Sequence, residues 1–385
     1  MGFDDPPPPP YTPDDCLPVH APPPAVPMAQ AMQREISLPD VLNQSYGRSI
    51  TRQERETYLA STNMPKGLAE EMVRSCEEFP LRIWIIDNSG SMATSDGHRP
   101  IQKPGGKEGL VDCSRWAELG DSLQWHATMA AFLAAPTEFR LLNPPEGGAM
   151  QVLECGVGPE PTSEIKAVQQ MLASGPRGVT PLCAQIRQVV ARVRREEGRL
   201  RAKGQKCIVV IASDGQASDG NVEVELRPLR ELPVWLVVRL CTDEDNVVEY
   251  WNGIDEDIEL EMDVLDDLSG EAAEITEQNP WLTYATPLHR IREWGTSNKF
   301  MDFLDEKRLT SSEFVEFAKI IFGRDATEGL PHPTANWPGF KEKMLILLSK
   351  TPLVWDPLRE RKRPWVSMKK LQRCYKPGGA SCAIS

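Results

Sequence analysis

The sequence predicts an α/β protein with a doubly wound, mostly parallel sheet, helices on both of its faces, and helical extensions beside disordered termini. Continuous apolar runs of strand length at 83–86 and 207–212, and a third at 234–241 that only Arg239 interrupts, are typical of strands that are buried on both sides. The segment 181–201 carries apolar residues on one helical face and Arg and Glu on the other. Strands and helices that alternate in this way build parallel sheets.

The chain of 385 residues has length for two ordinary domains or for one domain with large additions, and its 40% apolar content is enough for a core. Changes in composition and patterning divide the chain into five segments. We expect a disordered proline-rich tail at 1–40, a helical lead-in at 41–80, an α/β domain at 81–283, a helical extension at 284–350 and a basic tail at 351–385.

A polar cluster follows the first apolar run directly. Asp87, Ser89 and Ser91 stand at alternate positions in the sequence DNSGS, just beyond the carboxyl end of the expected strand. Open α/β sheets bind their ligands at this edge, and a carboxylate with two hydroxyls offers three oxygen ligands there. Asp, Ser and Gly are also ordinary turn residues, so this segment by itself fits a polar turn equally well.

Two later positions extend the pattern. Thr180 opens a helix after the glycine-containing turn 175–178, and Asp214 follows the strand expected at 207–212. With the DNSGS segment, these positions resemble the von Willebrand factor A domain and its metal-ion-dependent adhesion site, which combines DxSxS with a distant Thr and a distant Asp. The resemblance covers 81–283. It implies a ligand set of Asp87, Ser89, Ser91, Thr180 and Asp214, in which the hydroxyls contact the metal and the carboxylates act directly or through water.

Such an all-oxygen set suits a hard cation, Mg²⁺ or alternatively Mn²⁺ or Ca²⁺, and disfavours zinc. The resemblance implies that an acidic residue of a protein partner fills the remaining coordination position. We therefore expect a protein-binding adaptor or scaffold. We expect no enzyme, because the sequence shows no nucleophile paired with a base and no cofactor loop. A metal-dependent phosphohydrolase would need a second Asp two residues after Asp87, and Ser89 stands there.

Three other features of the sequence do not predict a further binding site. Residues 93–112 are rich in Gly and Pro and follow the motif directly, so we expect a loop at the rim of the metal site. His126 is expected to face the core, because no Cys or His stands at metal-ligand spacing from it. The acidic stretch 255–267 lacks the spacing of a calcium loop, and the alternation at 259–264 predicts an acidic edge strand.

The proline-rich amino-terminal segment contains a second binding motif. Pro8, Pro9 and Tyr11 form the PPxY pattern that WW domains recognise, following a polyproline run that preorganises the segment. A flexible tail without a partner is the simpler reading, since such runs arise by chance. If the motif is used, the alternative function is an adaptor that recruits a WW-domain ubiquitin ligase while the metal site is structural.

The carboxyl-terminal segment indicates attachment to a membrane. Cys382 begins the sequence CAIS, a CaaX pattern whose final Ser favours a farnesyl group, and basic residues gather upstream of it. One lipid chain binds membranes only marginally, so an anionic membrane surface attracting the basic segment would complete the anchor. Trp365 could sit at the interface, and Cys374 is a candidate for palmitoylation, although a plain thiol is the simpler reading.

Charge and cysteine usage indicate the compartment. A net charge of −13 and a pI near 5.1 argue against a general nucleic-acid binder. Nine cysteines without CxxC spacing, several of them inside apolar runs, are typical of reduced thiols in the cytosol. Since no stretch reaches the length of a membrane-spanning helix, we expect a cytoplasmic protein held peripherally on the cytosolic face of a membrane.

Overall fold

The computed structural model describes residues 49–375 except 104–106, 243 and 259. These residues all belong to the larger of two compact units, Val41–Ser385. The PPxY motif at Pro8, Pro9 and Tyr11 and the CaaX motif at Cys382 lie outside the described residues, as does the proline-rich tail at 1–40. Among the described helices, none is both long and apolar enough to cross a bilayer.

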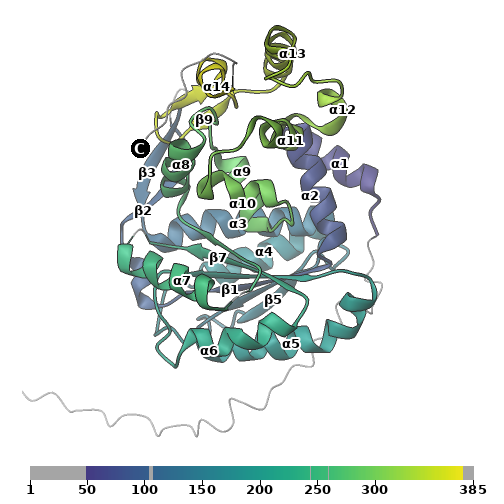
Figure 1. The fold of residues 1–385 in the computed structure, drawn as a ribbon. Coiled ribbons are helices and arrows are strands. Elements are labelled where there is room, and N and C mark those ends of the chain that lie inside the picture. Colours follow the sequence, from purple (N-terminus) through teal and green to yellow (C-terminus); the bar gives the residue numbers. More distant parts are fainter. Residues whose placement is uncertain (1–48, 104–106, 243, 259, 376–385) are drawn as a thin grey trace, which may run out of the picture. The chain divides into compact units, whose positions relative to one another are not determined.

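A six-stranded sheet forms the centre of this unit (Figure 1). All neighbouring strands are parallel except the β4–β5 pair at one edge, so the predicted α/β class with a mostly parallel sheet is confirmed. The strand at the opposite edge is short and lies in the acidic stretch 255–267, where an edge strand was predicted. In sheet order, the strands are β5 (Val152–Cys155), β4 (Thr137–Leu141), β1 (Leu81–Ile86), β6 (Cys207–Ser213), β7 (Val234–Leu240) and β8 (Met262–Leu265).

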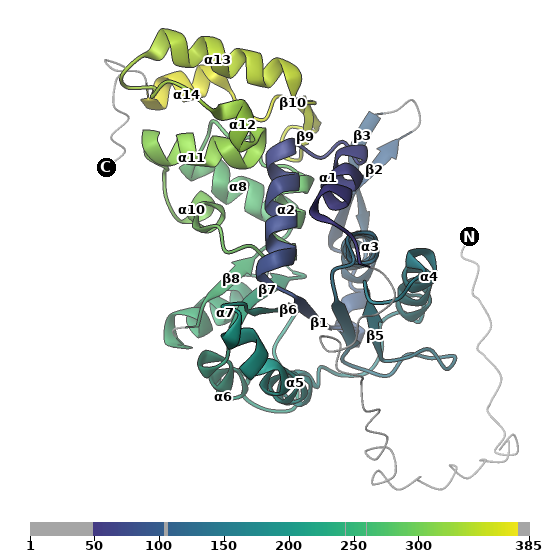
Figure 2. The same cartoon turned by 90° about the vertical axis from the view of Figure 1, so that its right-hand side faces the viewer.

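Each face of the sheet carries its own apolar cluster, because successive side chains of a strand point to opposite faces. Trp84 and Ile86 of β1 pack into one cluster, and Ile83 and Ile85 pack into the other. The neighbouring strands and the helices on each face supply the other members of both clusters (Figures 1 and 2). The first cluster includes residues of α2 (Lys66–Glu78), α3 (Arg115–Leu133) and α4 (Pro161–Leu172), and the second includes residues of α5 (Leu182–Ala202), α6 (Val222–Leu226) and α7 (Asp245–Ile258).

The helical lead-in consists of α1 (Arg52–Ser61) and α2, as the sequence predicted. Helix α2 packs closely against α11 (Ser311–Phe322) at Gly67, where an added Cβ atom would lie 2.4 Å from the carbonyl oxygen of Ile320. A larger residue would force the two helices apart. The lead-in is therefore part of the same core as the helices that follow the sheet.

The prediction of a loop at 93–112 was wrong. Residues Gly97–Lys103 form β2 and Lys107–Cys113 form β3, and the two strands pair with each other in an antiparallel ribbon. They do not join the main sheet. The ribbon lies outside the main sheet and lacks the long apolar runs of the central strands, so its composition resembled that of a loop.

A layer of helices follows the sheet along the chain and packs on the cluster that contains Trp84. Thr310 and Glu313 form a capping box at the start of α11. The expected basic tail is folded as far as the structure describes it, and Trp365 is fully buried in the core, so the expectation that it sits at a membrane interface was wrong. The remaining elements are α8 (Leu268–Gln278), α9 (Thr286–Trp294), α10 (Lys299–Glu306), α12 (Arg324–Thr327), α13 (Trp337–Lys350), β9 (Val354–Asp356), β10 (Arg361–Arg363) and α14 (Met368–Tyr375).

A buried carboxylate, Glu293 of α9, ties this layer to the sheet. It accepts hydrogen bonds from Ser122 Oγ at 2.8 Å and from Arg290 Nη1 at 2.7 Å. Arg239 of β7 lies 3.4 Å away, and the Nε2 atom of His126 lies at 3.2 Å. Burial by itself would raise the pKa of Glu293, but the charge of Arg290 and its other neighbours outweigh it and hold the pKa well below its usual value.

His126 faces the core as predicted and is fully buried. Burial, the largest cause, lowers its pKa to about 4, so the imidazole is neutral near pH 7. A neutral ring that bonds a buried carboxylate serves packing between α3 and α9.

Candidate metal site

The strand order places the predicted ligands at the ends of β1 and its neighbour β6, where the chain crosses from one side of β1 to the other. From β1 the chain proceeds to β4 on one side, while β6 pairs with β1 on the other. Asp87 follows β1 and Asp214 follows β6, and the register brings the strand ends level, with Ile86 opposite Ala212. The crevice at such a reversal is where open α/β sheets bind ligands.

Asp87 is fully buried and both of its carboxylate oxygens accept hydrogen bonds. The backbone N–H of Ser89 donates to Oδ1 at 2.8 Å, and Ser213 Oγ donates to Oδ2 at 2.6 Å. Burial raises the pKa of Asp87, the bonds from Ser213 and Ser89 partly offset this, and the nearby Asp214 raises it further. A cation placed here would stabilise the ionised carboxylate that burial disfavours.

Ser89, Ser91 and Asp214 form a chain of side-chain hydrogen bonds. The two serine Oγ atoms are 2.9 Å apart, and Ser91 Oγ donates to Asp214 Oδ1 at 2.9 Å. The 3₁₀ turn η2 (Gly90–Ala93) holds Ser91 at its start. Together with the Asp87–Ser89 bond, these contacts bring four of the five predicted residues into one hydrogen-bonded cluster.

Thr180 belongs to a separate loop that is tied to the first by backbone hydrogen bonds. The N–H of Gly90 donates to the carbonyl oxygen of Gly178 at 3.1 Å, and the N–H of Arg177 donates to that of Asn88. Thr180 is half-buried, and its hydroxyl makes no hydrogen bond to the part of the chain that the structure describes. This hydroxyl is therefore available to a ligand.

Two asparagines reinforce the link between these loops. Asn88 Oδ1 accepts from the backbone N–H of Asn143 at 2.8 Å, and Asn143 Nδ2 donates to the carbonyl oxygen of Val179 at 2.7 Å. Gly178 lies beneath this bridge at a φ of 74°, and an added Cβ atom would lie 2.7 Å from Asn143 Oδ1. The position of Thr180 thus depends on residues outside the five-residue pattern.

Sequence reasoning missed Arg115, a nearly buried residue at the start of α3. Its Nη1 atom donates to Asp214 Oδ2 at 3.0 Å, and the guanidinium also pairs with Asp96 and with Glu244, the latter at 2.8 Å. Hydrogen bonding to Asp96 is the largest cause that raises the pKa of Arg115. A cation in the first turn of a helix opposes the helix dipole, and this is the one signal that could have revealed its role.

The donors fit a hard cation. Four of the five proposed ligands are hydrogen-bonded to one another, and Thr180 supplies an unused hydroxyl on the loop tied to them. Oxygen is the donor atom that Mg²⁺ prefers. Arg115 offsets part of the charge of Asp214, so the site has less negative charge than two isolated carboxylates would give.

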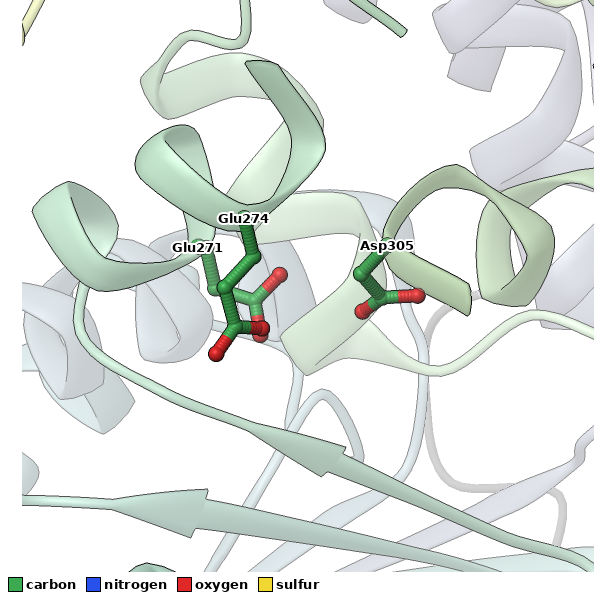
Figure 3. Close-up of side chains that lie close together, drawn as sticks. All are labelled: Glu271, Glu274 and Asp305. Carbon is green, nitrogen blue, oxygen red and sulfur yellow. The ribbon is translucent and has the colours of Figure 1, made fainter. Parts of the chain in front are cut away.

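A second acidic group lies in the layer that follows the sheet (Figure 3). Glu271 and Glu274 of α8 and Asp305 of α10 bring carboxylate oxygens within 4.8 Å of one another, a spacing that could hold a metal ion. Arg292 of α9, however, pairs with Glu271 and contacts Asp305 at 2.7 Å, and it also contacts Asp263 at 2.9 Å. Arg292 pairs with two of the three carboxylates of the triad, whereas Arg115 pairs with only one of the two carboxylates at the proposed site, so the triad is the less suitable site. Its residues come from two helices, so sequence spacing did not reveal it.

No protein-family model matches this chain, and no curated protein matches its sequence.

Proposed function

We propose that this protein is a Mg²⁺-dependent adaptor with a doubly wound fold like that of the von Willebrand factor A domain, which binds a carboxylate of a protein partner. The observation that carries the proposal is the hydrogen-bonded cluster at the carboxyl ends of two central parallel strands. The tethered loop that presents a free threonine hydroxyl beside it supports the same conclusion. The proposed metal ligands are Asp87, Ser89, Ser91, Thr180 and Asp214.

Bound Mg²⁺ would supply a fixed positive charge that attracts an anionic oxygen of the partner, and Mn²⁺ or Ca²⁺ could replace it. The hydroxyls of Ser89, Ser91 and Thr180 would contact the ion. Ser213 orients the Asp87 carboxylate and Arg115 orients that of Asp214, so both acids are held before the metal arrives. We propose a binding function and no catalytic one.

The surface beside Thr180 supports a protein partner. Val179 is 64% exposed and directly precedes Thr180, so the loop that carries a proposed ligand also exposes an apolar side chain. Arg177, in the same loop, pairs with Glu146 at 2.7 Å across the rim. A partner segment with an acidic residue beside an apolar one fits this combination, because apolar contact adds affinity to the metal–carboxylate bond.

We further propose peripheral attachment to the cytosolic face of a membrane through a lipid at Cys382. A single lipid chain gives only marginal binding, so a second, electrostatic contribution is needed. The basic residues upstream of Cys382 would supply it.

The test is binding of Mn²⁺ and Mg²⁺ to purified protein by calorimetry, followed by a lysate pull-down in Mg²⁺ and in EDTA. Thr180→Val removes one hydroxyl at constant shape, and we expect at least about tenfold weaker metal binding. Thr128→Val is the matched control, because Thr128 is half-buried like Thr180 and its hydroxyl bonds only Gln124 of its own helix.

In the pull-down, partners retained by the wild type in Mg²⁺ and lost with EDTA or with Asp214→Ala would support the adaptor function. Asp325→Ala, which removes an exposed carboxylate elsewhere, should keep them. Identical partners in every condition would contradict the proposal and direct attention to Tyr11 and the WW-domain alternative.

A further inference from the structure

The carboxyl-terminal part of the described chain has a charge opposite to that of the whole. Residues 341–375 contain ten basic and three acidic residues, a net charge of +7 in a protein whose net charge is −13. Such segregation creates a local positive potential on an otherwise acidic molecule.

This basic segment is folded, so its charges have fixed directions. Helix α14 buries Leu371 and Tyr375 in the core and exposes Lys369 and Arg373, one helical turn apart, on its outer side. Lys369 and Arg373 form no ion pair with the described residues. The β9–β10 hairpin, which precedes this helix, exposes further basic residues at positions 359, 361 and 362.

The cations outnumber the anions available to them. Arg359 and Arg363 share one buried carboxylate, Asp356, at 3.0 and 3.6 Å. Burial lowers the pKa of Lys370 in α14, and the charges of Arg359 and Arg363 lower it further. Helix α14 and the β9–β10 hairpin lie at the same end of the unit in both views, and together they carry an excess of positive charge (Figures 1 and 2).

Exposed apolar side chains accompany this surface. Seven large apolar side chains are exposed in the part of the chain that the structure describes, and four of them fall between residues 345 and 358. Leu353 and Leu358, 55% and 39% exposed, lie directly before β9 and in its turn to β10. Scattered exposed leucines are ordinary, but a group among basic residues is typical of surfaces that enter a bilayer interface. The other two, Leu345 and Ile346, lie on α13.

We propose that this basic face docks directly on an anionic lipid bilayer, with the leucines entering the interface and the basic side chains contacting the headgroups. The face consists of Leu353, Leu358, Arg359, Arg361, Lys362, Lys369 and Arg373. This inference rests on the proposed attachment to the cytosolic face of a membrane, and it names the surface that contacts the bilayer. The electrostatic contribution to membrane binding then comes from a folded surface, which orients the protein, and not from a flexible tail. Exposed leucines favour a bilayer over a nucleic acid, whose backbone offers no apolar phase.

The experiment is vesicle flotation of the full chain produced without lipid modification. Vesicles of phosphatidylcholine alone are compared with vesicles that also contain roughly 30% phosphatidylserine, in EDTA, so that neither Cys382 nor the metal site takes part. We expect binding to the anionic vesicles only, and weaker binding as salt is raised. The double variant Lys369→Glu, Arg373→Glu should bind at least about 25-fold less, since each basic residue contributes about fivefold.

Two further variants complete the experiment. Arg194→Glu with Lys203→Glu makes the same change of net charge on and just beyond α5, which lies on the opposite side in Figures 1 and 2, and should leave binding unchanged. Leu353→Ser with Leu358→Ser should weaken binding at constant charge. Failure of the unmodified protein to float with anionic vesicles overturns the inference, and so does an equal loss of vesicle binding in the α5 variant. The calorimetric test of the metal site is unaffected by any of these results.

Discussion

Arg115 Nη1 donates a hydrogen bond to Asp214 Oδ2 over 3.0 Å, and both side chains are nearly buried. The other oxygen of Asp214 accepts from Ser91. One carboxylate thus joins the proposed metal site to the first turn of α3, and the guanidinium holds the carboxylate in place when no metal neutralises it.

Removal of Arg115 should therefore destabilise the metal-free protein. Arg115→Ala leaves the Asp214 carboxylate buried without a cation, and we expect a loss of about 3 kcal/mol in the free energy of unfolding. Mg²⁺ should restore part of it, so that the variant gains more from metal than the wild type does. Urea unfolding in Mg²⁺ and in EDTA measures both effects. Arg187→Ala, which removes an exposed pair with Glu225, should change stability by less than about 1 kcal/mol. Equal effects of the two substitutions would contradict the assigned role.

The loop that carries Thr180 offers a matched pair of glycines. Gly178 and Gly175 have φ values of 74° and 71°, so alanine at either position adopts a left-handed conformation that costs about 1 kcal/mol. Only at Gly178 would the new Cβ atom meet Asn143, while nothing lies within 4 Å at Gly175. We expect Gly178→Ala to weaken Mn²⁺ binding and Gly175→Ala to leave it unchanged, as measured by calorimetry. Loss of metal binding in both variants would show that general loop strain, and not the Asn143 contact, is responsible.

The buried carboxylate of Asp87 should give the metal-free protein a pH dependence of a particular sign. Burial raises its pKa above the unfolded value, so its favourable contribution is complete below the unfolded pKa and is lost as pH rises through the folded pKa. Asp87→Asn does not titrate. In EDTA, the stability of this variant relative to the wild type should therefore increase as pH rises from about 3 to about 7. Thermal unfolding across that range tests the sign, and the advantage should shrink when Mg²⁺ is added.

Among the buried acids between the sheet and the following helices, Glu293 should be the one whose substitution lowers the free energy of unfolding most. Its pKa is held well below the usual value, so it stabilises the fold above the unfolded pKa, and this contribution is lost as pH falls through the folded pKa. Glu293→Gln leaves Arg290 and Arg239 without their buried carboxylate partner, and we expect a loss of about 3 to 5 kcal/mol in urea unfolding at neutral pH. Glu316→Gln, which removes an exposed pair with Lys319, should cost less than about 1 kcal/mol. A small loss at Glu293 would mean that apolar packing alone holds α9 on the sheet.

Local patterns in the sequence predicted the α/β class and the mostly parallel sheet. Apolar runs such as 83–86 and 207–212 must be buried on both faces, which implies a mostly parallel sheet, and residues that follow parallel strands must meet at one edge. The sequence alone therefore predicts that Asp87 and Asp214 lie close together. The DNSGS segment by itself fits a polar turn and a ligand site equally well, because both use the same residue types.

Tertiary structure decided which distant charges meet. Arg115 with Asp214, and Glu293 with Arg239 and His126, join residues from different elements at separations that no periodicity encodes. Periodicity reports which face of an element is apolar, but pairing of buried charges depends on how helices are placed over the sheet. For the same reason, the sequence predicted that the basic segment is a tail. Its few apolar residues pack into the core of the preceding helices, and only this packing fixes the basic side chains on one folded surface.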